Sequence, residues 1–164
     1  MKSSSWLRNL ISNRAPRGRT PHRPGAQRFR PHLEALEDRT LPSSGPTILA
    51  VTSLADSGKD TLRSAILDAD QHTNKTYEID IHVTGTILLE SSLPDLANTI
   101  SIVGLGTSKT LIQRDTLAAP FRILTVDAGE TTTLLGLEIA QGNAGSANGG
   151  AIDNFGNLTL TKAC

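Results

Sequence analysis

Aromatic side chains are scarce in this chain of 164 residues, where Phe, Trp and Tyr together make up 3%. Trp6 and Phe29 fall among the first 46 residues, so only Tyr77, Phe121 and Phe155 remain for the rest of the chain. A core with so few aromatics has to be filled by Leu, Ile, Val and Ala. Side chains of these sizes suit an interior that is narrow and regular.

Cysteine and long apolar runs are also nearly absent. Cys164 is the single cysteine, which excludes an internal disulfide and any cysteine-based metal site. No run approaches the roughly 18 apolar residues needed to cross a bilayer. The first residues, MKSSSWLRNLISNRAPRGR, lack the apolar stretch of about 7 to 15 residues that an ordinary signal peptide contains. We therefore expect no transmembrane segment and no standard export signal.

Charge divides the chain into two parts. Residues 1–46 hold nine Lys and Arg against three Asp and Glu, a net charge of +6, whereas residues 47–164 hold seven against thirteen, a net charge of −6. The first part is also rich in Pro, Gly and Arg, and such a stretch buries too little apolar surface to offset its chain entropy. We therefore expect a disordered basic leader over 1–46 and a folded domain over 47–164.

The basic leader allows three interpretations: electrostatic binding to nucleic acid or anionic lipid, a spacer, or an export address. Proteins that bind single-stranded nucleic acid also use aromatic side chains on which bases stack, and the leader offers only Trp6 and Phe29. We therefore expect no nucleic-acid partner.

One segment of the folded part has helical periodicity. DTLRSAILDADQ (60–71) carries apolar residues at the i, i+3, i+4 and i+7 spacing that places them on one helix face, namely Leu62, Ala65, Ile66 and Ala69. Asp60 or Thr61 is available as the N-cap. The pattern predicts an amphipathic helix over 61–70.

After this helix the period changes to two. In EIDIHV (78–83), Ile79, Ile81 and Val83 alternate with polar residues, which is typical of a strand with one buried face. Five further segments are short, rich in Leu or β-branched residues, and bounded by turn residues: GTILLESSL, NTISIVGLG, FRILTVDAG, TTLLGLEIAQG and NLTLTKAC. Together with TILAVTSLADSG (47–58), they predict strands separated by turns.

The turns distinguish between three architectures. An antiparallel sandwich favours two-residue hairpins, and only Ala128-Gly129 and Gly156-Asn157 come close to that pattern. A doubly wound α/β fold needs a helix after nearly every strand, and one helix is predicted. In a solenoid, parallel strands stack on their equivalents in the coil below. Aligning Thr133-Leu134 with Thr159-Leu160 gives an offset of 26 residues, within the range expected of such coils.

Three segments carry a family resemblance. VTSLADSGKDTLRSAILDAD resembles the first segment of bacterial right-handed parallel β-helix proteins, sometimes called the CSLREA segment, with Asp60 where that name has Cys and Ser64 where it has Glu. GNAGSANGGAIDNFGNLTLT resembles the GGAI repeat of polymorphic outer-membrane proteins. RPHLEALEDRTLPS is similar to an N-terminal motif of large exported or surface proteins of bacteria. The resemblance implies an all-β, right-handed parallel β-helix of the pectate-lyase type with an N-terminal capping helix.

The resemblance also implies roles for particular residues and a location. The helix at 61–70 would cover the open first coil, whose unpaired backbone groups otherwise promote aggregation. Gly149 and Gly150 would turn the chain with positive φ, and Asn143 and Asn154 would bond the backbone of a neighbouring coil. An extracellular or cell-surface location follows, with the leader as the export address. NLTLTKAC would then begin a coil that continues past residue 164, so that the chain is an amino-terminal fragment.

Two motifs suggest ligands but depart from the required patterns. GLGTSKT (104–110) has Ser108 and Val103 where a phosphate-binding loop needs Gly, so we interpret it as a turn between strands. GGAIDN has Ile152 where a calcium-binding nonapeptide repeat has its second glycine position, and Asp153 comes one place early. Asp68 and Asp70 lie near the end of the predicted helix, and we interpret that end as solvated. No metal and no cofactor is expected.

The strongest candidates for catalysis are Glu78, Asp80 and His82. These residues alternate along one predicted strand and would project to one side about 6.7 Å apart. Carboxylates separated by about 6.5 to 9.5 Å suit inverting glycoside hydrolysis. The alternative interpretation, which we favour, is a solvated outer face next to the cap.

Two functions follow from the sequence. The first is a non-enzymatic β-helical module of an exported or cell-surface bacterial protein, adhesive or structural, with an extracellular glycan or another surface protein as partner. The second is a polysaccharide lyase or glycoside hydrolase that acts on an acidic polysaccharide. The catalytic groove of such an enzyme needs acidic or basic side chains aligned on successive coils. The sequence shows no such alignment apart from Glu78, Asp80 and His82. We expect a monomer unless the open last coil self-associates.

Overall fold

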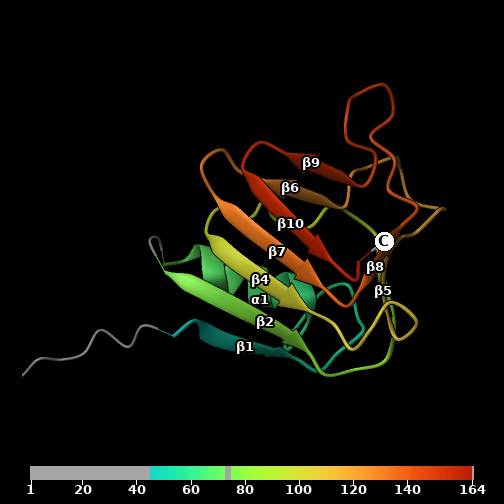
Figure 1. Ribbon diagram of the computed structural model, residues 1–164. Helices are drawn as coiled ribbons and strands as arrows, with labels where there is room; N and C mark the ends of the chain where they lie inside the picture. The colour runs from blue at the N-terminus through green and yellow to red at the C-terminus, as the bar shows by residue number, and fades with distance from the viewer. Residues whose placement is uncertain (1–44, 73–74, 164) are drawn as a thin grey trace, which may run out of the picture. The chain divides into compact units, whose positions relative to one another are not determined.

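The computed structural model describes residues 45–72 and 75–163, which lie in one compact unit (Figure 1). The predictions made for residues 1–44 fall outside these residues.

The described part contains ten strands and one helix. In chain order they are β1 (Thr47–Val51), α1 (Leu62–Asp70), β2 (Thr76–Ile81), β3 (Gly85–Leu89), β4 (Thr99–Val103), β5 (Thr110–Arg114), β6 (Leu124–Val126), β7 (Thr131–Leu135), β8 (Glu138–Ala140), β9 (Ile152–Asn154) and β10 (Asn157–Thr161).

The strands form three parallel sheets, with orders β1-β2-β4-β7-β10, β3-β5-β8 and β6-β9. The chain visits the sheets in turn, so that each strand lies on its equivalent from the coil below, and Figure 1 shows the coils rising from β1 to β10 with a right-handed winding. This arrangement confirms the predicted right-handed parallel β-helix. Every strand pair in the described part is parallel, which rules out the antiparallel sandwich.

The number of residues in a coil varies while the register of the five-stranded sheet is kept. Thr47 pairs with Tyr77, Thr76 with Thr99, Ile100 with Thr132, and Thr131 with Asn157, which are offsets of 30, 23, 32 and 26 residues. The last pairing also places Thr133 against Thr159 and Leu134 against Leu160. The predicted offset of 26 is therefore confirmed for this coil, and the other coils differ because their turns differ in length.

The interior is a narrow stack of aliphatic side chains. Ile79, Ile102 and Leu134 occupy the same register position on three successive strands, and each is 0% exposed. The neighbouring inward column holds Tyr77, Ile100 and Thr132. Because parallel strands repeat about every 4.8 Å, each side chain is covered by its equivalent in the next coil. Most of the stability of the fold is expected to come from this burial.

Helix α1 lies between β1 and β2 in the chain, so the first coil consists of one strand and this helix. Its buried residues are the four predicted from the periodicity, Leu62, Ala65, Ile66 and Ala69, and they belong to the same core as the strands. Thr61 is the N-cap: its side chain accepts a hydrogen bond from the Ser64 amide, and the Ser64 side chain accepts one from the Thr61 amide. This capping box satisfies two amides at the start of the helix. The predicted capping helix is therefore confirmed.

Strand β5 was not among the strands predicted from the sequence. The preceding GLGTSKT segment is a turn, as predicted: Gly106 has a φ of 125°, and its carbonyl accepts hydrogen bonds from the amides of Lys109 and Thr110 at 2.8 and 2.9 Å. The strand that follows carries Thr110, Ile112 and Arg114 on its buried side. A charged residue at a buried position hides the alternation on which the prediction depends.

Candidate functional site

The three candidate catalytic residues lie at the carboxyl half of β2 and just beyond it. Glu78 and Asp80 alternate with the buried Ile79 and Ile81, so their side chains are on the outer face of the five-stranded sheet, and both are half-buried. His82 follows the end of the strand and is exposed, with its amide donating to the Val51 carbonyl at 2.9 Å. The structure thus places two of the three residues on one strand face.

No further carboxylate extends this pair along the stack. In register, Glu78 lies between Ile48 and Ser101, and Asp80 lies between Ala50 and Val103. A catalytic groove across several coils needs ionisable groups on successive strands. On the described strands of this sheet the two acids have only hydroxyl and aliphatic neighbours.

Above β2 the outer face of the sheet is uncharged and rich in hydroxyl groups. We call the outward residues of β4, β7 and β10 the hydroxyl face: Thr99, Ser101, Val103, Thr131, Thr133, Leu135, Asn157, Thr159 and Thr161. Two straight columns cross it, one made by Thr99, Thr131 and Asn157 and the other by Ser101, Thr133 and Thr159. Neighbouring members of a column are about 4.8 Å apart, and the columns are about 6.7 Å apart.

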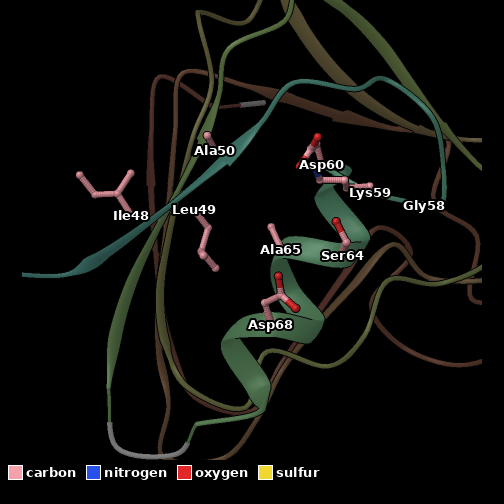
Figure 2. A pocket seen from close by; sticks show the side chains of 9 residues that line it. All are labelled: Ile48, Leu49, Ala50, Gly58, Lys59, Asp60, Ser64, Ala65 and Asp68. Carbon is pink, nitrogen blue, oxygen red and sulfur yellow. The ribbon is translucent and has the colours of Figure 1, made fainter.

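A pocket of about 660 Å³ opens at the lower end of the solenoid between β1 and α1 (Figure 2). In Figure 2 the side chains of Leu49 and Ala65 lie on facing sides of the pocket, whereas Ile48 points away from the helix. Its charged lining residues are Lys59, Asp60 and Asp68, all exposed. These three groups come from the helix side of the pocket, and β1 contributes only aliphatic side chains.

Arg63 fastens the capping helix to the next coil. Its guanidinium forms an ion pair with Asp56 at 2.6 Å and also donates to the Asp56 carbonyl at 3.1 Å. The same group donates to the carbonyls of Ser91 and Ser92 at 2.9 and 2.5 Å. A planar guanidinium is suited to such divergent bonds because its donors are fixed in a fork. Sequence reasoning missed this residue, although it stands in the segment that carries the family resemblance.

Arg114 is a second structural arginine, and it is 7% exposed. It donates to the carbonyls of Gln141, Asp115 and Ala118 at 2.7, 2.9 and 3.1 Å. Its guanidinium carbon also lies 5.9 Å from the centre of the Phe121 ring, within the range of a cation–π contact. Main-chain carbonyls thus satisfy the buried cation, which joins β5 to the turns of its own coil and the next.

The carboxyl end of α1 is only partly the solvated end that the sequence predicted. Asp68 is exposed, but Asp70 is half-buried, and its Oδ1 atom is buried without a hydrogen-bond partner. Burial raises the pKa of Asp70 above its ordinary value, and the nearby charges of Asp127 and Asp95 raise the pKa further, while a hydrogen bond from the Ala97 amide opposes them. Next to it, Asn98 donates to the Ala69 carbonyl at 3.0 Å and so caps the helix from the following coil.

The side chains of Asn143 and Asn154 form hydrogen bonds within their own turns. The expectation that they would bond the backbone of a neighbouring coil is therefore wrong. Asn143 accepts from the Gly145 amide at 2.8 Å, and Asn154 accepts from the Gly156 amide at 3.2 Å. Both are Asx turns, in which the side chain replaces a backbone acceptor.

The glycine pair behaves as expected at one position only. Gly149 has a φ of 71°, and a Cβ there would meet the Ile152 carbonyl. Gly150 is not among the glycines with positive φ. The Asp153 carboxylate, which follows this pair, is bound to the guanidinium of Arg122.

Two features that would indicate a function are absent from the part of the chain that the structure describes. Residues 45–72 and 75–163 contain no group of three or more His, Cys, Asp or Glu side chains placed to hold a metal ion. The same residues include no helix of the length and apolarity needed to span a membrane.

The fold defines the chain as a parallel β-solenoid of four coils with a helical cap. No protein-family model matches the chain, and no curated protein or solved structure gives a significant match.

Proposed function

We propose that this chain is a non-enzymatic β-helical module of an exported or cell-surface bacterial protein, and that its hydroxyl face adheres to glycans. The observation that carries the proposal is the pair of straight columns of hydroxyl and amide groups on three stacked strands. Sugars present many hydroxyl groups that both donate and accept, as Ser and Thr side chains do.

The absence of charge on this face favours a neutral polysaccharide. An acidic polysaccharide would need Arg or Lys on the face that it meets, and the outward positions of β4, β7 and β10 hold neither. Glu78 and Asp80 lie beside the hydroxyl face and would repel such a polymer. This argument separates the proposal from the second function predicted from the sequence, an enzyme of acidic polysaccharides.

The rigidity of the stacked coils also supports a role of the hydroxyl face in binding glycans. Backbone hydrogen bonds link each strand of the sheet to the next, so the spacing of the surface groups is set by the fold. A preordered surface loses little conformational entropy when a ligand binds. Weak contacts repeated along a polymer then add up, which is the physical basis of adhesion by such a surface.

A binding assay with a matched control tests the proposal. The double variant Thr133→Val and Thr159→Val removes two hydroxyl groups of one column and keeps the shape of the side chains. If each hydroxyl contributes about 1 kcal/mol, the Kd for a neutral glycan should rise about thirtyfold. The control is Thr86→Val, an exposed outward residue of the β3-β5-β8 sheet, and its Kd should be unchanged.

Three outcomes would contradict the proposal. The first is the absence of binding to any neutral glycan on an array, and the second is an equal loss of affinity in the control variant. The third is depolymerisation of a pectin-like or alginate-like substrate that disappears in Asp80→Ala. Labelling of intact cells with an antibody against the folded domain tests the surface location, because an intracellular module would remain unlabelled.

A further inference from the structure

Asn148 is followed by Gly149 in the loop GNAGSANGGA (142–151), which joins β8 to β9. In Figure 1 this loop extends beyond the stacked strands. An asparagine before a glycine cyclises readily, because glycine has no side chain to obstruct the approach of its amide nitrogen to the preceding side chain. The loop therefore contains a candidate site for a chemical modification of the chain by itself.

The Gly149 amide is available as the attacking group. Among the described residues, no acceptor forms a hydrogen bond with it. Asn154 in the same coil differs, because the amide that follows it belongs to Phe155 and donates to the Val126 carbonyl at 2.9 Å. The Asn154 side chain is also held in its Asx turn. An amide that already donates must first lose its hydrogen bond, so Asn148 should react and Asn154 should not.

Arg122 lies in the equivalent loop one coil lower, between β5 and β6, and contacts the reacting peptide. Its guanidinium donates to the Asn148 carbonyl at 3.3 Å and forms an ion pair with Asp153. When the Gly149 amide loses its proton, the negative charge spreads onto this carbonyl oxygen. A cation placed where charge develops stabilises the charged state. The coil below thus supplies a group that promotes cyclisation.

We propose that Asn148 is a self-modification site and that Arg122 promotes the reaction. The Gly149 nitrogen forms a bond to the Cγ atom of Asn148, and its proton passes through solvent to the side-chain amino group, which leaves as ammonia. Water then opens the resulting succinimide ring at either carbonyl and gives aspartate or isoaspartate. Both steps proceed without oxidation or reduction. This proposal is independent of the glycan-binding role.

The modification changes the loop in charge and in length. Both products place a new carboxylate beside the Arg122 guanidinium, which already pairs with Asp153. Isoaspartate also adds one carbon to the main chain directly before Gly149, where a Cβ would already meet the Ile152 carbonyl. The isoaspartate form of the loop should therefore pack less closely on the start of β9 than the unmodified form does.

Peptide mapping by mass spectrometry tests the site in the full chain. During incubation at neutral pH, Asn148 should convert to aspartate and isoaspartate, which electron-transfer fragmentation distinguishes. Asn154 is the internal control and should stay unmodified in the same sample. The proposal is overturned if Asn148 stays intact in the folded chain for as long as the urea-unfolded chain needs to convert it. Equal conversion of Asn154 in the folded chain also overturns it.

Two variants test the role of Arg122. Arg122→Met removes the guanidinium and should slow the conversion of Asn148 about fivefold, which corresponds to about 1 kcal/mol of activation free energy. Asp153→Asn leaves the guanidinium without its counterion and should accelerate the conversion. Because both variants break the same ion pair, a merely structural role would shift both rates in the same direction, and that result overturns the role of Arg122.

The unfolded chain gives the control for both variants. In urea the contact between Arg122 and the Asn148 carbonyl is lost, so the wild type and the two variants should convert at equal rates. Far-ultraviolet circular dichroism checks that each variant is folded in the native measurement. A difference in rate that persists unchanged in urea would show that the folded contact has no part in the reaction.

Discussion

Replacing Ile66 by alanine should strongly destabilise the fold, because this residue of the capping helix is 0% exposed within the core. The change removes three carbon atoms from the interior, a loss of about 2.4 kcal/mol at about 0.8 kcal/mol for each. The cavity left behind adds to this loss, and measured substitutions of this type cost about 2 to 5 kcal/mol. We expect a decrease of about 3 to 4 kcal/mol in the free energy of unfolding.

The matched control is the neighbouring residue of the same helix. Leu67 is 49% exposed, so Leu67→Ala should cost less than about 1 kcal/mol. Urea denaturation followed by circular dichroism measures both variants. With m-values of about 1 to 3 kcal/mol/M, a loss of 3 kcal/mol lowers the midpoint by about 1 to 3 M. If Ile66→Ala lost no more stability than Leu67→Ala, the helix would not seal the interior and the reasoning would be refuted.

Three further predictions concern the cap. Arg63→Met should lower the free energy of unfolding by about 2 kcal/mol in urea denaturation, because it removes the four hydrogen bonds to Asp56, Ser91 and Ser92. An unchanged urea midpoint would show that these hydrogen bonds contribute nothing to the stability of the fold. Thr61→Ala should cost about 1 kcal/mol through loss of the N-cap, whereas Thr61→Ser should retain most of the stability. Asp70→Asn should stabilise the chain at neutral pH, because the raised pKa means that the folded state resists ionisation of this group. The stability that protonated Asp70 contributes is present below its unfolded pKa of 3.8 and is lost as the pH rises through the folded value, so the advantage of the variant should vanish in acid. A pH-independent difference in thermal midpoint would contradict this assignment.

The fold could be predicted from the sequence where local patterns and packing agree. The four apolar residues of α1 follow the helical period, and all of them are buried. The alternation in β2 and the repeat between Thr133-Leu134 and Thr159-Leu160 likewise reflect positions that the solenoid uses directly. The absence of helices between later strands then excluded the doubly wound fold. These signals survive in the sequence because burial repeats at the same positions of each coil.

Other features depend on contacts between coils and leave little local signal. Strand β5 was missed because Arg114 occupies a buried position, and the carbonyls that satisfy it come from three separate residues. The partly buried state of Asp70 depends on the loop around Ala97 in the following coil. Two of the four hydrogen bonds of Arg63 reach Ser91 and Ser92, which are far away in the sequence. Residue spacing alone carries no information on such pairings.

The candidate site likewise has some features that local sequence patterns predict and others that depend on contacts between coils. The alternation placed Glu78 and Asp80 correctly on one outer strand face. The hydroxyl columns were not predicted, because they join residues from coils of unequal length and become visible only in the register. A search for Thr or Ser two residues apart, as in Thr99 and Ser101 or Thr131 and Thr133, could have detected them. That signal is weak without knowledge of which strands are neighbours.

The most direct measurement of the stacked coils is nuclear Overhauser spectroscopy on protein with labelled Ile, Leu and Val methyl groups. The parallel register predicts contacts that follow one column, from Ile79 to Ile102, from Ile102 to Leu134, and from Leu134 to Leu160. Contacts that instead connect consecutive strands across Ala128-Gly129, as in a hairpin, would contradict the account.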